Sequence, residues 1–451
     1  MTVAIALLIS FGLLLISIQQ GVPILWPLSG ALVIMAGVYR WRGIRWHRLA
    51  TLMAQGIRQS MGVLSILLLI GLVVASWLIA GTVPALVYYG LQLIHPHWFL
   101  VSAFVLSAVV SALLGTSFGS AGTLGLALMI MARGAEVHEH WAAGAIIAGV
   151  YVGDRCSPMS SSAHLVATIT GTDIYRNLRN MMTTSWGALA LSLLIYGVAS
   201  LQNPLSGEGN VLIQTIPERF SVNLITLLPA AVLVVLTLLR VPVRRTLAVS
   251  LGSAIALALS IQAQPILTVL KTLLLGLQLP NTDPLSEIFQ GGGLWAMVQV
   301  CAVVLVSTAL AGLLSGMGTF DQLGRWLSQW SGQRGLFGST ILASALTSAF
   351  GCTQTIAILL TQQIAQPLYV ASNTSQEQLA VDIENSAVVL APLVPWNIAG
   401  LVPATVLLTD AGFVPYAVYL YLLPLLNWLF RVPPASSAFK SQKDRELRVE
   451  G

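Results

Sequence analysis

Long apolar stretches recur along the whole chain, and they constrain its fold more than any other feature of the sequence. A helix of roughly 17–25 predominantly apolar residues crosses a bilayer, and many windows of this kind can be drawn here. Only 8% of the 451 residues are charged, against about a quarter in a soluble domain. The sequence therefore predicts an integral, multi-pass membrane protein. The clearest apolar stretches are residues 4–18, 61–80, 98–114, 189–201, 224–239, 247–261, 293–314 and 413–430.

Short clusters of basic residues lie beside or between these stretches, at 40–48, 240–245 and 440–448. Loops rich in Lys and Arg usually face the cytoplasm. Because two helices precede the first cluster, we expect the N-terminus and the C-terminus to be cytoplasmic. We do not interpret the net charge of +5 as a nucleic-acid footprint. We expect the chain to be embedded in the lipid bilayer and to bind no nucleic acid.

The apolar stretches fall into two halves. We expect a first membrane half at residues 1–201, a connecting loop at 202–222, a second membrane half at 223–431 and a disordered cytoplasmic tail at 432–451. The fold class is an all-α polytopic membrane protein with about ten to twelve membrane elements, some of them too short to cross.

Each half contains a stretch of small polar residues inside an otherwise apolar segment. SALLGTSFGSAGT at 111–123 resembles SAFGCTQTIA at 348–357, which predicts hairpins near 111–123 and 347–358. Small residues are common wherever membrane helices pack closely, so either stretch alone is interpreted as packing. Their repetition in the two halves favours a functional role.

An acidic, serine-bearing break follows each of these stretches. The breaks are GDRCSP at 153–158 and DIENSAVVLAPLVPWN at 382–397, and they predict broken helices near 153–160 and 384–397. Paired interruptions at corresponding positions are typical of the binding site of a secondary transporter.

Three acids, Asp154, Asp382 and Glu384, are candidates for membrane depth. An acid at the centre of a membrane helix costs roughly 2.5–3.5 kcal/mol, so such residues usually face a cavity and serve a function. Burial disfavours the charged form of a carboxyl, which allows it to exchange a proton for a cation. The structural alternative for Asp154 is an ion pair or a helix cap.

Hydroxyl groups and freed carbonyls near Asp154 offer oxygen ligands for a hard cation such as sodium. Asp154, Ser157 and Ser160 are spaced by three, which places them on one face of a helix, and Pro158 would break that helix. Arg155 is interpreted either as a fixed cation that holds the other half or as a side chain that reaches an interface.

The second break offers Glu384, Asn385 and Ser386, with Asn397 further on. Prolines at 392 and 395 mark a broken element. Asn397 is interpreted either as the cap of the next helix or as a ligand.

A serine hydrolase is the third hypothesis, because GTSFG at 115–119 has the G-x-S-x-G pattern and His164 offers a base. That pattern needs a strand before the serine and a helix after it. Its flanks here are membrane-helical, so we do not expect an enzyme.

The run GDRCSPMSSSAHLVATITGTDIYRNLRNM, from residue 153, resembles the NhaC family of sodium/proton antiporters. The family carries Gly-Asp-Lys-x-Ser-Pro-x-Ser-Asp-Thr-Thr-Asn-Leu and then Gly-Thr-Asp before a basic segment. PLVPWNIAG at 392–400 is similar to its second motif. This chain departs from the family at 161–164, where Ser-Ser-Ala-His replaces Asp-Thr-Thr-Asn, and at Arg155, which replaces Lys.

The resemblance implies a helical secondary transporter with two inverted repeats, and with re-entrant hairpins that carry Thr116, Ser117 and residues 352–354. It also implies a homodimer that exchanges sodium for protons or, in some members, malate and lactate. His164 would then carry the proton, contact an anionic substrate or pack against backbone carbonyls; a histidine can change its charge near neutral pH.

Our leading hypothesis is a proton-coupled antiporter of a bacterial inner membrane that exchanges sodium or a similar monovalent cation, with Asp154 as the carrier that binds sodium. Sodium and protons are then transported species, and no cofactor is expected. The alternative is an organic-anion transporter of the malate/lactate type, or an amino-acid transporter, on the same scaffold. The candidate site comprises Asp154, Ser157, Ser160, Ser161, His164, Thr116, Ser117, Thr353, Gln354, Glu384, Asn385, Ser386 and Asn397.

Overall fold

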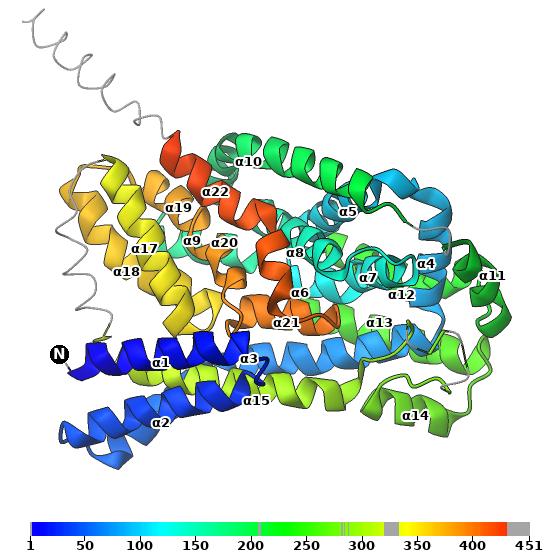
Figure 1. Cartoon of the computed structure of the whole chain (residues 1–451), viewed down its shortest axis with the longest axis horizontal. Coiled ribbons are helices and arrows are strands. Elements are labelled where there is room, and N and C mark those ends of the chain that lie inside the picture. Colours follow the sequence, from blue (N-terminus) through cyan, green and yellow to red (C-terminus); the bar gives the residue numbers. More distant parts are fainter. Residues whose placement is uncertain are drawn as a thin grey trace, which may run out of the picture.

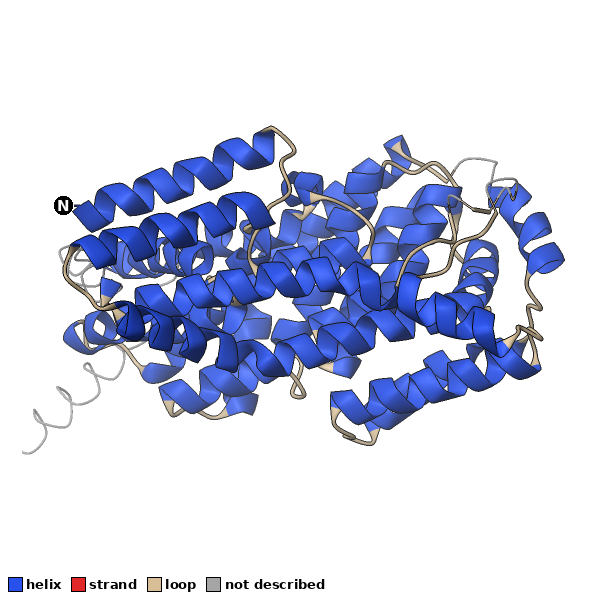
Figure 2. Ribbon diagram, turned by 90° about the horizontal axis from the view of Figure 1, so that it is seen from below, coloured by secondary structure: helices blue, strands red, loops and turns tan. Residues whose placement is uncertain are grey.

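The computed structural model describes residues 2–205, 209–280, 283, 285–286, 288–319 and 333–430. Within these ranges every named element is a helix, and Figure 2 shows helices joined by loops. The expectation of an all-α fold is confirmed.

The first part of the chain forms ten helices among its described residues, joined by short turns (Figure 1). They are α1 (Thr2–Gln19), α2 (Leu25–Trp41), α3 (Trp46–Ile79), α4 (Thr82–Leu93), α5 (Phe99–Leu114), α6 (Ser117–Ser120), α7 (Leu126–Gly134), α8 (Glu139–Cys156), α9 (Ser161–Thr170) and α10 (Ile174–Gln202), with η1 (Pro96–Trp98) before α5 and η2 (Ala121–Gly125) before α7.

The described residues of the second part continue the helical pattern. They form α11 (Gly209–Arg219), η3 (Leu224–Leu227), α12 (Leu228–Leu238), α13 (Val243–Ser260), α14 (Ile266–Leu275), α15 (Gly293–Gly316), α17 (Gln333–Gly351), α18 (Gln354–Ala371), α19 (Gln376–Glu384), α20 (Ala387–Leu390), η4 (Ala391–Leu393), α21 (Ile398–Val406), η5 (Ala411–Tyr416) and α22 (Val418–Leu429).

The described residues hold enough apolar helix to cross a bilayer several times. Five helical stretches have the length and composition of a span, two bent helix pairs do so when each pair counts as one span, and four shorter helices are apolar. The described residues therefore hold five to seven candidate spans, and the protein is a polytopic membrane protein; the expected number of ten to twelve membrane elements stays a prediction. The longest is α3, whose 34 residues extend about 51 Å and exceed the roughly 30 Å hydrocarbon core.

α8 lies in the interior of the bundle, where α5, α7, α10 and α22 pack around it (Figure 1). Every residue from Ala142 to Arg155 is buried. A helix that is enclosed on all sides needs no single apolar stripe. The charged end of α8 is therefore held inside protein.

Glycines bring two helix pairs together at backbone distance. A Cβ on Gly149 would collide with the carbonyl of Phe104, and one on Gly153 with the carbonyl of Ala108, so these glycines fix α8 against α5. The crossing of α3 and α15 depends on Gly56 in the same way. Close approach through small residues is a common basis of helix association in membranes.

The turns after α5 and α17 have the same local geometry. Gly115 and Cys352 have φ values of 64° and 57°, in the left-handed region. Each is followed by an extended threonine, Thr116 or Thr353, whose hydroxyl caps the next helix. The two small-residue stretches that resemble each other in sequence thus form equivalent turns.

Each turn lies against one of the predicted breaks. The Ser157 hydroxyl donates to the carbonyl of Ala112 at 2.6 Å, next to the first turn. The Asn397 amide donates to the carbonyl of Ser348 at 2.7 Å, next to the second turn. The structure therefore pairs turn and break in both parts of the chain.

Several expectations about segments are corrected. The connecting loop at 202–222 contains the helix α11, and the predicted break at 384–397 is two breaks, one at 385–386 and one at 394–397. α8 ends at Cys156, so Asp154, Ser157 and Ser160 do not share a helical face. The predicted disordered tail at 432–451 lies outside the described residues.

Candidate functional site

Asp154 lies in the last turn of α8, and 4% of its surface is exposed. The Ser160 hydroxyl donates to its Oδ1 at 2.9 Å. The Ser117 hydroxyl, from the start of α6, lies near the same carboxyl. Two separate segments, before α9 and at the start of α6, thus bring hydroxyl groups to one buried acid on α8.

Ser160 also organises the start of α9. Its hydroxyl oxygen accepts from the amides of Ser162 and Ala163 and lies 2.8 Å from the Ser162 hydroxyl. Ser162 is buried and belongs to the cluster around Asp154, although sequence reasoning missed it. The sequence signal that could have identified Ser162 is its position in the run of three serines at 160–162.

Ser161 and His164 lie on the other side of α9, where both are exposed. The His164 Nε2 lies 2.9 Å from the carbonyl oxygen of Pro158. Because Pro158 turns the chain before the cap at Ser160, the pair at 160 and 162 faces the protein interior. The structure does not bring Ser161 or His164 to the carboxyl of Asp154.

Arg155 is completely buried and makes hydrogen bonds to residues far along the chain. Its guanidinium donates to Ser185, to the Tyr419 hydroxyl at 3.3 Å and to the Oδ1 of Asn385. Arg155 is therefore a fixed internal cation that ties α8 to α10, α19 and α22. Of the two interpretations of Arg155, the structure selects this one.

Glu384 ends α19, and only 1% of its surface is exposed. Neither of its carboxylate oxygens has a hydrogen-bond partner among the described residues. The charges of Arg155 and Asp154 both act on it. A buried carboxylate without donors is rare, and here it lies next to a second buried acid.

The remaining predicted residues serve the backbone or neighbouring side chains. Gln354 donates to the carbonyl of Val388 at 3.2 Å, and the Ser386 hydroxyl accepts from Ser344 and donates to the carbonyl of Asp382. The Asn397 oxygen caps α21 while its nitrogen bonds Ser348. Both ends of the Asn397 amide are thus engaged.

The pattern of a serine nucleophile is not supported by its surroundings. Helix α5 precedes Gly115–Thr116–Ser117, where a nucleophile elbow needs a strand. The ring of His164 lies against the carbonyl oxygen of Pro158, and Ser117 lies near Asp154.

Tyr151 is a further residue at the site that sequence reasoning missed. It lies one helical turn before Asp154 and interacts with both Asp154 and Ser117. Its hydroxyl donates to the carbonyl of Ala399 in α21 at 2.7 Å. The sequence signal that could have identified Tyr151 is its spacing of three from Asp154, because residues three apart lie on the same face of a helix.

Two buried acids, a buried arginine and hydroxyl groups at helix breaks, set inside a bundle of membrane helices, are typical of a secondary transporter. The sequence profile of the Na⁺/H⁺ antiporter family matches residues 149–431, which include Asp154, Arg155, Ser160 and Glu384. The chain belongs to this family.

Relatives with assigned names support the same class. The chain is 27% identical over 415 residues to the Na⁺/H⁺ antiporter NhaC of Alkalihalophilus pseudofirmus, which covers 90% of this chain and 89% of the relative. It is 24% identical to a malate-2H⁺/Na⁺-lactate antiporter of Bacillus subtilis, over 92% and 89% of the two chains. An arginine/ornithine antiporter, ArcD of Halobacterium salinarum, is 26% identical over 93% and 87%.

Proposed function

We propose that this protein exchanges sodium, or a similar small monovalent cation, for protons, and that Asp154 carries either the cation or the proton. The observation that supports this most directly is the buried carboxyl of Asp154 with the Ser160 hydroxyl 2.9 Å away. Carboxylate and hydroxyl oxygens are the ligands that hard cations prefer.

Competition between sodium and a proton for the carboxyl of Asp154 couples the transport of the two ions. With a proton bound, Asp154 is neutral and can remain buried at little electrostatic cost. With sodium bound, the pair of charges is again neutral, and the hydroxyls of Ser117, Ser160 and Ser162 supply further oxygens. When neither sodium nor a proton is bound, Asp154 is an uncompensated buried anion. Its electrostatic cost disfavours the transport movement of the protein with an empty site.

Glu384 is the second acid of this site. Among the described residues its oxygens have no hydrogen-bond partner and so can accept a proton or bind a cation, and the fixed positive charge of Arg155 offsets its negative charge when neither is bound. We propose that Glu384 holds a proton or assists Asp154 with the cation.

The substitution Asp154→Asn tests the proposal. Purified protein in proteoliposomes should lose sodium/proton exchange while it still inserts and purifies normally. The matched control is Asp173→Asn, an exposed acid that caps α10 through the amide of Arg176, because asparagine caps a helix as well as aspartate does. Exchange at the wild-type rate by Asp154→Asn protein would overturn the assignment.

A second candidate function is exchange of an organic anion or an amino acid. The malate/lactate and arginine/ornithine relatives support it, and so does the buried guanidinium of Arg155, whose Nε has no hydrogen-bond partner in the part of the chain that the structure describes. A thermal-shift series with sodium, malate, lactate and arginine separates the two candidates. Stabilisation by sodium alone supports the first, and stabilisation by an organic solute without sodium supports the second.

We also propose a bacterial inner-membrane location, cytoplasmic termini and a homodimer. The basic clusters at 40–48 and 440–448 support the orientation. The homodimer is carried over from the family resemblance, and light scattering of the detergent-solubilised protein, corrected for bound detergent, measures it. No cofactor is invoked, since sodium and protons act as transported species.

A further inference from the structure

A cavity of about 570 Å³ lies between α21, η5 and the connection from α1 to α2. Its volume falls in the usual range for small-molecule sites, roughly 300–1,000 Å³. Its rim includes the exposed residues Val22, Asp410 and Pro415. Its floor includes the buried residues Gly400 and Phe413. The cavity therefore leads from the surface of the protein into the helix bundle.

Helix α8 runs beside this cavity from its rim to its floor. At the rim, the Nε2 of His140, in the first turn of α8, lies 2.8 Å from the Oδ1 of Asp410. At the floor, the Tyr151 hydroxyl donates to the carbonyl of Ala399 at 2.7 Å. Tyr151 follows His140 by eleven residues, which extend about 17 Å along a helix. Asp154 lies one turn further in the same direction.

A proline inside α21 leaves the carbonyl of Ala399 available to other groups. Pro403 has no N–H, so the carbonyl four residues before it receives no α-helical hydrogen bond. That carbonyl belongs to Ala399, and the Tyr151 hydroxyl bonds it instead. Tyr151 is completely buried and interacts with Asp154 and Ser117. A carbonyl freed in a broken helix is an oxygen ligand that transporters offer to cations.

The floor of the cavity is bare backbone where it meets this carbonyl. Gly400, the residue after Ala399, has no side chain, and a Cβ there would lie 2.3 Å from the carbonyl oxygen of Pro392. α21 also contacts α6 and α8, which carry Ser117 and Asp154. The short helix α21 therefore connects the cavity to the candidate site.

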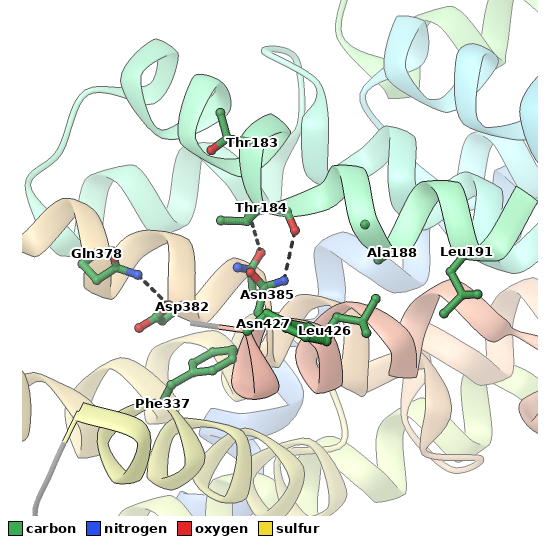
Figure 3. Close-up of a pocket in the computed structure, with 12 residues that line it drawn as sticks. Thr183, Thr184, Ala188, Leu191, Phe337, Gln378, Asp382, Asn385, Leu426 and Asn427 are labelled. Carbon is green, nitrogen blue, oxygen red and sulfur yellow. Dashed lines mark hydrogen bonds between the residues drawn. The ribbon is translucent and has the colours of Figure 1, made fainter. Parts of the chain in front are cut away.

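A different cavity, of about 670 Å³, lies between α10, α17, α19 and α22 (Figure 3). Figure 3 shows Thr184 and Asn385 on its wall, where they share a hydrogen bond of 3.4 Å. Both also accept hydrogen bonds from Arg155. That cavity therefore meets the site at Arg155, whereas the cavity at α21 meets it at Tyr151, close to Asp154.

We propose that the cavity at α21 is an entry path for a monovalent cation and that its floor is an entry subsite. There the carbonyl oxygen of Ala399 and the hydroxyl oxygen of Tyr151 bind the cation before it reaches Asp154. In this structure the two groups bond each other, which closes the subsite, and a cation that binds both oxygens replaces their hydrogen bond. The inference rests on the proposed function and adds the route and the first ligands of its substrate.

Thiol labelling tests the entry path without depending on transport. Thr405→Cys places a thiol on the wall of the cavity, and Leu8→Cys places one in the middle of α1, where Leu8 is 71% exposed and lines no part of the cavity. Both variants react with a cationic methanethiosulfonate reagent, and the labelling of wild-type protein is subtracted. The thiolate is the reactive form, and it forms in water and not in lipid. Position 405 should therefore react several-fold faster than position 8, although Leu8 is exposed and Thr405 is partly buried.

Two substitutions test the subsite itself. Tyr151→Phe keeps the aromatic ring and removes the hydroxyl. Pro403→Ala supplies an N–H to the carbonyl of Ala399 and so weakens its hold on a cation. Each should raise several-fold the sodium concentration that gives half of the maximal rise in melting temperature, and the KM for sodium in exchange, with less change in the maximal rate. A structural role alone would not weaken sodium binding in Pro403→Ala, which should keep or raise the melting temperature without sodium because alanine favours a helix.

The matched control is Pro367→Ala, which makes the same change inside α18, away from both cavities, and should leave sodium binding unchanged. Equal labelling at 405 and 8 would overturn the entry path. Sodium binding in Tyr151→Phe and Pro403→Ala that matches this control would overturn the subsite while the proposed function stands. If one of these variants does not fold, the other decides. If labelling and sodium binding behave as expected while wild-type protein exchanges no sodium for protons, the proposed function fails and the subsite stands.

Discussion

At the residue scale, the buried charges of Arg155 and Glu384 depend on each other. Arg155 is fully buried and bonds Ser185, Tyr419 and Asn385, whereas Glu384 has no hydrogen bond of its own among the described residues. Removing Arg155 leaves Glu384 without its nearby positive charge and also removes the hydrogen bonds to Ser185, Tyr419 and Asn385. Breaking such a buried charged network costs about 3–5 kcal/mol.

We expect Arg155→Ala to lower the free energy of unfolding by about 3–5 kcal/mol, and Glu384→Gln in the same chain to restore part of that loss. Thermal unfolding of the detergent-solubilised variants measures both effects. The control is Arg176→Ala, which removes an exposed ion pair with Glu377 at 3.2 Å and should cost less than about 1 kcal/mol. Strictly additive losses in the double variant would contradict the coupling.

At the element scale, the turn after α5 and the break after α8 form one unit. Gly115 has a φ of 64°, and a Cβ there would lie 2.5 Å from the Cβ and 2.6 Å from the carbonyl carbon of Met159. Gly171 has a nearly identical φ of 66° with nothing within 4 Å. The two glycines therefore share the same backbone strain and differ in their neighbours.

Gly115→Ala should destabilise the protein more than Gly171→Ala does. Both variants carry the left-handed strain of about 1–2 kcal/mol, and only the first must also push the turn away from Met159. Because that movement displaces Ser117 from Asp154, we expect exchange to fall in Gly115→Ala and to persist in Gly171→Ala. Melting temperatures measure the loss of stability, and proteoliposome flux measures the loss of exchange. Equal losses in Gly115→Ala and Gly171→Ala would show that the turn at 115 tolerates the displacement.

At the scale of the whole molecule, close helix crossings hold the bundle together. A Cβ on Gly56 of α3 would collide with the carbonyl of Thr308 on α15, whereas Gly252 of α13 has open space around it. Overpacking at a well-packed contact typically costs about 1–3 kcal/mol.

Gly56→Ala should therefore destabilise the protein by about 1–3 kcal/mol. Gly252→Ala should leave stability unchanged or raise it by up to about 1 kcal/mol, because alanine favours helix. Thermal unfolding in one detergent compares the two variants directly. If Gly56→Ala left the stability unchanged, α3 and α15 would be able to move apart without a cost in free energy.

The orientation of the molecule gives a further prediction. If the termini are cytoplasmic, a cysteine at Arg42 should resist an impermeant maleimide in intact cells and react after the membrane is permeabilised. A cysteine at Asn203 should react in intact cells. Wild-type protein provides the background. The reverse pattern would invert the proposed orientation.

Much of the architecture could be predicted from the sequence. Apolar length and scarce charge predict membrane helices because an uncompensated polar group is costly in a bilayer. The equivalent turns at Gly115 and Cys352 correspond to stretches that already resemble each other. Of the site, the two acids at the breaks, Asp154 and Glu384, could be proposed because acids are expensive at membrane depth.

Tertiary structure alone decided which neighbours these acids have. α8 ends at Cys156, so the spacing of three that proposed Ser157 and Ser160 does not follow a helical face there and could not point to Ser162. Arg155 bonds Ser185 and Tyr419, which lie 30 and 264 positions away. The sequence by itself determined a helical membrane antiporter with acids at its breaks. Only packing selected the oxygens around each acid, because a side chain's direction beyond a helix end depends on what it packs against.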